Sequence, residues 1–396
     1  MADYKKHNLV SNYGYEIYQA DGTLRERYMP EPEASCEGTL DLEIKDQNGK
    51  IKQKDSVPIR SLQRGIIAQI FSSAGSSTSN ESAYRFQNRW FYSPQSGQWP
   101  QSGSNIMSGS CSPYGGIFVC NQSSSGTNKT CSFMGSDNIN ESFVSMSSVS
   151  DPLHYDNDSG TIKISLTRAN VQPGSGSASK IALIGSQSND ARYVYAMDSL
   201  SSSWAQNDSI RITYNFEFPT SASSTITKNM LVDWFTNFDT SMRLKNLSGT
   251  DVACRNTSPS LTICGCKYIY GASANQIDKG IVLGTSDADV SWEDTDFTDS
   301  VFDVNVLKPL ATSAADFTGE IVSGTTVYCQ HARNFQNISD HAVTIKEAGV
   351  ITHPTNTTYC VASVDSFLLA HWLTGDVVVN PGETIRVYWK PTIIVD

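Results

Sequence analysis

Alternation of apolar and polar residues is the feature that most constrains the fold of this chain. The clearest case is residues 210–218, Ile-Arg-Ile-Thr-Tyr-Asn-Phe-Glu-Phe, in which apolar and polar residues fall on opposite faces of an extended strand. Residues 161–167 alternate in the same way, and so do residues 343–347 and 385–389 near the carboxyl terminus. Successive side chains of a strand point to opposite faces, so this period predicts half-buried antiparallel strands.

Residues 328–396 contain several such runs close together in sequence. Turn-forming residues separate the runs, among them Asn337, Gly349 and residues 380–382. Short alternating runs bounded by Gly, Pro, Asn and Asp are typical of strands joined by hairpins. We therefore expect about five strands here, enough for a small β-sandwich with its own core.

The rest of the chain divides into segments of different character. Residues 1–75 are expected to form a small β domain, a possible docking unit, with hairpins about residues 21–22 and 48–49. Apolar residues recur at helical spacing in residues 60–72, which predicts one amphipathic helix near there. The chain as a whole is predicted to be mainly β, with several antiparallel sandwich-like or barrel-like domains and long Ser/Asn/Gly-rich loops.

Residues 76–155 are poor in aliphatic residues and are predicted to be a loop-rich insertion, whereas residues 156–396 are expected to form the main β-sandwich region. Aromatic rings can stack on sugar rings, and they also dominate cores and interfaces. The aromatic cluster of the insertion is therefore a candidate contact with a glycan or a partner protein, with local packing as the alternative. Its members are Tyr84, Trp90, Tyr92 and Trp99.

Four motifs follow one another in a particular order in the last part of the chain. They are Arg333-Asn334-Phe335-x-Asn337, Val343-x-Ile345-x-Glu347-x-Gly349, Phe367-Leu368-Leu369-Ala370 and Pro381-Gly382-Glu383-Thr384-x-x-Val387. Together with an upstream segment that contains Gly284, this order resembles a carboxyl-terminal module found in virion proteins of tailed bacteriophages. The resemblance implies a structural protein of the virion, assembled in the host cytoplasm. It gives a structural role to Gly284, Arg333, Asn334, Phe335, Glu347, Gly349, Pro381 and Gly382.

Composition narrows the class of partner. Only 17% of the 396 residues are charged, which fits a β-rich assembly protein better than a helical enzyme. The formal net charge is −11 and Lys and Arg form no stripe, so we expect no nucleic-acid partner. The sequence has no long apolar window and no apolar segment at its start, so we expect neither export by a signal peptide nor membrane insertion.

Three groups of residues invite a metal-site interpretation, and none has the required spacing. Cys264 and Cys266 are one residue apart with no second pair in position, so we expect them and Cys254 to be buried thiols. The acidic residues between Asp287 and Asp299 lack the central glycine of a calcium loop, which favours a solvated loop. Histidines without His-x-His spacing are expected to be solvated or satisfied in the core. These are His331, His341, His353 and His371.

Catalytic motifs are also missing from the sequence. We find no nucleophile elbow, phosphate-binding loop or dinucleotide fingerprint, and therefore expect no enzymatic activity, catalytic residue, metal or cofactor. The nine cysteines, an odd number, are expected to be mostly reduced thiols.

These observations lead to one hypothesis and two alternatives. The chain is expected to be a non-enzymatic tail, collar or fibre component that forms a homo-oligomer and contacts other virion proteins. The first alternative is a receptor-binding protein that recognises a host surface glycan. The second is a capsid decoration or head-fibre protein.

Overall fold

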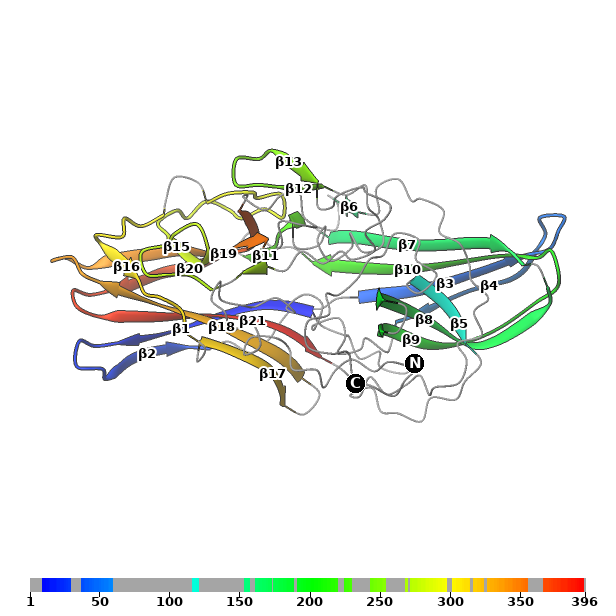
Figure 1. Cartoon of the computed structure of the whole chain (residues 1–396), viewed down its shortest axis with the longest axis horizontal. Coiled ribbons are helices and arrows are strands. Elements are labelled where there is room, and N and C mark those ends of the chain that lie inside the picture. Colours follow the sequence, from blue (N-terminus) through cyan, green and yellow to red (C-terminus); the bar gives the residue numbers. More distant parts are fainter. Residues whose placement is uncertain are drawn as a thin grey trace.

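The computed structural model describes residues 9–29, 37–59, 116–120, 153–156, 161–172, 174–188, 191–219, 224–229, 243–253, 268–269, 271–297, 301–313, 316–323, 326–354 and 366–394. Within these ranges the chain is mainly β, and each strand pair is antiparallel. The predicted fold class is thereby confirmed. The strands form two lobes that lie end to end in an elongated molecule (Figure 1).

The first lobe, here called the inserted lobe, contains two sheets. A five-stranded sheet has the order β4-β3-β10-β7-β6, and a three-stranded sheet has the order β5-β8-β9. The strands are β3 Glu37–Lys45, β4 Ile51–Pro58, β5 Gly116–Cys120, β6 Leu153–Asp156, β7 Thr161–Val171, β8 Gly176–Ser188, β9 Ala191–Trp204 and β10 Ser209–Pro219.

Strand β10 lies at the centre of the five-stranded sheet and shows why the alternation in sequence matters. Its apolar residues Ile210, Ile212, Tyr214 and Phe216 are buried, whereas the polar residues between them are partly or fully exposed. The hydroxyl of Tyr214 donates to the carbonyl oxygen of Ile181 on β8 at 3.0 Å, which ties the two sheets together. The inner face of this strand therefore forms the core of a two-layer lobe.

The second lobe, here called the terminal lobe, contains the remaining strands. One sheet, the β21 sheet, has the order β16-β18-β21-β1-β2 with β17 paired to β18; another, the β19 sheet, has the order β11-β20-β19-β14 with β15 paired to β19. The strands are β1 Leu9–Tyr18, β2 Leu24–Tyr28, β11 Ser224–Ile226, β12 Arg243–Lys245, β13 Asp251–Ala253, β14 Tyr268–Ile269, β15 Gly280–Gly284, β16 Leu307–Pro309, β17 Phe317–Ser323, β18 Thr326–Asn337, β19 Val343–Pro354, β20 Phe367–Val379 and β21 Thr384–Ile394. Strands β12 and β13 form a separate ribbon.

The two large sheets of the terminal lobe pack face to face as a sandwich. Tyr13 on β1 stacks on Trp372 on β20, with ring centroids 5.5 Å apart. At the edge, Nη2 of Arg25 on β2 donates to the carbonyl oxygen of Val378 on β20 at 2.6 Å. Residues from both chain termini therefore contribute to one sandwich.

The two amino-terminal hairpins form at the expected turns but join different sheets. Strand β1 pairs with β21 along its whole length, from Leu9 opposite Ile393 to Tyr18 opposite Thr384. Strand β3 pairs instead with β10 in the inserted lobe. The sequence analysis placed both hairpins in one unit, residues 1–75. In the structure they pair with strands far away in the sequence, and such pairing cannot be recognised from the local pattern of residues.

Two local details are not evident from the sequence. Residues 301–306 do not form a strand: Val301 makes one bridge to Gly284, and Asp303 then accepts hydrogen bonds from the amides of Asn305 and Val306 in a turn. The apolar runs 367–370 and 377–379 belong to one strand, β20, which bulges at Gly375, where φ is +70°. The helix expected near residues 60–72 and the residues Cys254, Cys264 and Cys266 lie outside the described ranges.

Candidate functional site

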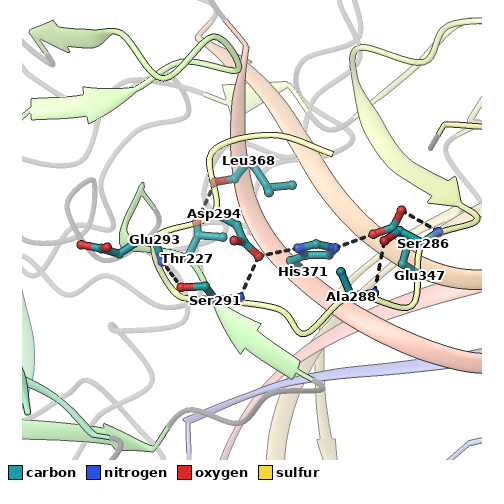
Figure 2. Close-up of polar contacts among 9 residues, drawn as sticks. All are labelled: Thr227, Ser286, Ala288, Ser291, Glu293, Asp294, Glu347, Leu368 and His371. Atoms are coloured by element: carbon teal, nitrogen blue, oxygen red, sulfur yellow. Dashed lines mark hydrogen bonds and ion pairs between the residues drawn. The ribbon is translucent and has the colours of Figure 1, made fainter. Parts of the chain in front are cut away.

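A cluster of three charged side chains lies on the β19 sheet of the terminal lobe (Figure 2). His371 on β20 stands between Asp294, in the loop after β15, and Glu347 on β19. Its Nδ1 lies 2.7 Å from Oδ2 of Asp294, and its Nε2 lies 3.0 Å from Oε2 of Glu347. The imidazole therefore bridges two carboxylates, and in its protonated form it donates a hydrogen bond to each.

Backbone amides of the loop at residues 285–297, here called the strap, hold the two carboxylates in place. Oδ2 of Asp294 accepts the amide of Ser291 at 2.8 Å, and Oε1 of Glu347 accepts the amide of Ser286 at 3.2 Å. Figure 2 shows the strap running past His371, with these two contacts on either side of the ring. The cluster is thus a link between the strap and two central strands of the sheet.

Two glycines make room for this cluster. A Cβ on Gly284 would lie 2.7 Å from Cγ of Glu347, and a Cβ on Gly349 would lie 2.9 Å from Cζ of Phe297. Phe297 in turn packs against the ring of His371, with centroids 4.9 Å apart. Neither space tolerates a side chain without displacing its neighbour, which explains why glycine occupies both positions.

Electrostatics favour the charged form of the imidazole. Burial alone lowers the pKa of His371, because it penalises the imidazolium. Hydrogen bonds to Asp294 and Glu347, together with their negative charges, outweigh burial and raise the pKa of His371 above its ordinary value. Both ring nitrogens of His371 are engaged by carboxylates, so the arrangement is suited to holding the strap against the sheet.

Arg333 on β18 is a second buried charge, and its hydrogen bonds to the described residues go to backbone carbonyls. Its three guanidinium nitrogens donate to five carbonyl oxygens at 2.6–3.3 Å, those of Ser273, Gln276, Lys279, Ile281 and Leu310. Burial lowers the pKa of Arg333 to about 10, and the nearby charge of Asp278 opposes this shift. The side chain remains charged at neutral pH and fixes the loop 271–279, which has no sheet partners of its own along most of its length.

Asn337 performs a similar role at the end of β18. Its Nδ2 donates to the carbonyl oxygens of His341 and Val379, both at 2.8 Å, and its Oδ1 accepts the amide and hydroxyl of Ser339. Its backbone amide and carbonyl bond to the 380–383 turn, where Gly382 has φ of +78°. A positive φ of this kind favours glycine, so the Pro381-Gly382 motif is the turn that docks on Asn337.

The structure brings most of the motif residues together in the terminal lobe. Gly284, Glu347 and Gly349 belong to the histidine cluster; Arg333 packs on the ring of Phe335 at 5.4 Å. Asn334 accepts the amide of Leu310 through its backbone carbonyl. The four aromatic candidates lie outside the described residues. They are Tyr84, Trp90, Tyr92 and Trp99.

Sequence reasoning placed His371 among core-satisfied or solvated histidines but did not find its partners. Asp294 was assigned to a solvated acidic loop; Asp287 in that loop is exposed and pairs with Lys346 at 2.8 Å, whereas Asp294 binds His371. One signal was present: His371 interrupts the apolar run 367–372, and Glu347 takes the next position on the apolar face of the alternation that begins with Val343 and Ile345. A charged residue in such a run requires a partner.

Among the described residues, no group of three or more His, Cys, Asp or Glu side chains is placed to hold a metal ion. In the same part of the chain, no helix has the length and apolar character needed to cross a membrane. Comparison with known proteins finds no matching family model, curated protein or solved structure.

Proposed function

We propose that this chain is a non-enzymatic structural component of a tailed-phage virion, a tail, collar or fibre protein that self-associates and contacts neighbouring virion proteins. The main support for the proposal is that several motif residues are buried and hold strands and loops together. Arg333, Asn337 and Glu347 are buried, and the contacts described above join strands and loops inside one sandwich. The motifs on which the resemblance to phage proteins rests therefore serve as scaffold.

The positions of exposed apolar side chains support self-association. Ile51 and Val171 are 48% and 57% exposed and lie in one row across the end of the five-stranded sheet, through Lys45 and Ser209. At the opposite end of the molecule, beside the turns that connect β1 to β2 and β18 to β19, Leu24 and Ile338 are 46% and 47% exposed. Apolar side chains at both ends of an elongated molecule are suited to contacts with further subunits.

The first test asks whether the chain belongs to the particle. Mass spectrometry of purified virions should detect the protein at a fixed copy number, and immunogold labelling should place it at one position. Absence from purified particles would overturn the proposal, as would release of reducing sugar from host polysaccharide by the purified protein.

The second test concerns self-association. Light scattering of the purified chain should give a mass of more than one subunit, and Val171→Glu should lower that mass at a given concentration. The matched control is Ile277→Glu, because Ile277 is 42% exposed but lies in the loop before β15, in the terminal lobe and away from the row that contains Val171. An unchanged mass in the Val171 variant would exclude that end as a contact.

A further inference from the structure

The strap is held to the β19 sheet by apolar packing, by backbone hydrogen bonds and by the hydrogen bond between Asp294 and His371. Only the last of these depends on a group that changes its charge near neutral pH. Phe297 packs over Gly349, and the amide of Lys228 donates to the carbonyl oxygen of Trp292 at 2.6 Å. These contacts do not titrate near neutral pH. The bond between Asp294 and His371 does, because it depends on the proton of an imidazole.

We propose that the proton on His371 controls whether the strap is closed on the β19 sheet, so that the strap is held in neutral and acidic conditions and released in alkaline conditions. This goes beyond the structural role proposed above. It rests on the geometry of the three-residue cluster.

The direction of release follows from the burial of the two carboxylates. A neutral imidazole has one N–H, so it donates to one carboxylate and turns a lone pair toward the other. Glu347 is 1% exposed and cannot turn to water, whereas the side chain of Asp294 is 24% exposed. The remaining N–H is therefore expected on Nε2, facing Glu347, because a carboxylate that faces a lone pair and cannot reach water is the costlier state. The lone pair then faces Asp294, which lies on the strap and can be hydrated.

Other charged groups around the cluster do not replace this link. On β19, Lys346 pairs with the exposed Asp287 at the start of the strap, at 2.8 Å. After β11, Nζ of Lys228 lies 5.1 Å from the ring centre of Trp292. Neither lysine contacts His371 or Asp294 in the described structure, and the pKa of Lys346 is raised further by its hydrogen bond to Asp287.

Linkage gives the sign of the effect. The pKa of His371 is raised in the folded chain, so its contribution to strap closure is fully present below the ordinary histidine pKa and is lost as pH rises through the raised value. Between the ordinary and the raised pKa the equilibrium constant for strap opening rises about tenfold per pH unit, because opening releases one proton. Above the raised pKa the rise ends, and strap opening depends only on the contacts that do not titrate.

Hydrogen exchange of the full-length chain between pH 6 and 10 tests the proposal directly. After correction for intrinsic rates, protection of the amides of Ser286, Ser291 and Asp294 is expected to fall by up to about tenfold per pH unit as the pH rises toward the His371 transition. Residues 210–216 in the inserted lobe provide the internal reference, whose protection should stay constant. Nitrogen NMR of the His371 ring, with both nitrogens protonated at pH 7, locates the transition independently.

His371→Gln provides the matched variant, because a neutral amide can still donate one hydrogen bond. Its strap is expected to show lower protection at pH 7 and no remaining pH dependence. The proposal is overturned if wild-type strap protection stays flat while the NMR signal of His371 titrates. It is also overturned if both ring nitrogens are not protonated at pH 7. The wild-type measurements decide the question even if the variant does not fold.

Discussion

Several buried polar side chains of the terminal lobe donate hydrogen bonds to backbone carbonyl oxygens. Thr227 and Asn229 both donate to the carbonyl oxygen of Leu368, at 2.6 and 3.2 Å, while Arg333 and Asn337 serve other loops. Connections between strands leave carbonyl groups without ladder partners, and a buried carbonyl without a donor costs free energy. In this lobe side chains supply those donors, so single residues determine the paths of whole loops.

The first residue-scale prediction concerns Gly349. Substitution Gly349→Ala should lower the free energy of unfolding by about 1–3 kcal/mol, because the new methyl group must displace Phe297 or the backbone near Ala370, whose oxygen would be 3.0 Å away. Urea denaturation measures the change. Gly174→Ala is the control, since nothing lies within 4 Å of a Cβ there. Equal stability of the two variants would show that the space at Gly349 is not confined.

The second residue-scale prediction concerns Arg333. In Arg333→Lys the ammonium has three donors for five carbonyl oxygens, so about two buried acceptors lose their partner and the free energy of unfolding should fall by roughly 2–4 kcal/mol. The control is Arg211→Lys on the exposed face of β10, with a change expected below about 0.5 kcal/mol. A loss of unfolding free energy in Arg333→Lys no larger than that of the control would show that the five carbonyl hydrogen bonds of Arg333 do not stabilise the fold.

At the scale of the element, alternation was enough to predict strands but not their partners. In β10 the alternation of residues 210–216 correctly predicts which side chains are buried, because each second residue is apolar and faces the core. Strand β1 shows the limit, because nothing within residues 9–18 indicates that they pair with residues 384–393. The histidine cluster shows it again, since Asp294, Glu347 and His371 come from three elements, and only the sandwich brings them together.

Edge strands give the element-scale prediction. Strand β4 ends the order of the five-stranded sheet, and it carries Lys52, Lys54 and Pro58, which are residues that discourage pairing with another chain. Lys54→Val should increase irregular, concentration-dependent association while changing the free energy of unfolding by less than about 0.5 kcal/mol. Sedimentation velocity over a concentration series measures this, with Lys54→Gln as the uncharged polar control. Identical sedimentation of the two variants would show that the edge is protected in another way.

For the whole molecule, the order of strands along the chain is the main organising fact. Strands β1 and β2 belong to the terminal lobe, β3 to β10 to the inserted lobe, and β11 to β21 to the terminal lobe again. The chain therefore leaves one sandwich, builds a second, and returns. Where β3 begins and β10 ends, Glu37 lies opposite Glu217, so the inserted lobe has its entry and exit side by side.

In the terminal lobe, the point where the chain leaves after β2 and the point where it returns at β11 are also close together. Tyr28, at the end of β2, packs on Tyr13 with centroids 5.7 Å apart, and Tyr13 stacks on Trp372. Trp372 lies opposite Ser224, the first residue of β11. A short linker is thus able to join residue 29 to residue 224 without stretching either strand.

Excision of the inserted lobe is the prediction that follows. A chain of residues 9–29, a flexible linker of roughly ten residues, and residues 224–394 should fold with the β21 and β19 sheets intact, and residues 37–219 should fold separately. Circular dichroism and hydrogen exchange would check both, with protection of residues 343–350 as the marker for the terminal lobe. The matched control is residues 224–394 without β1 and β2, which exposes the edge of β21 and uncovers Trp372, and should be unfolded or aggregated. Folding of that control to the same stability would mean that β1 is dispensable, and that the sandwich is built by the carboxyl-terminal part alone.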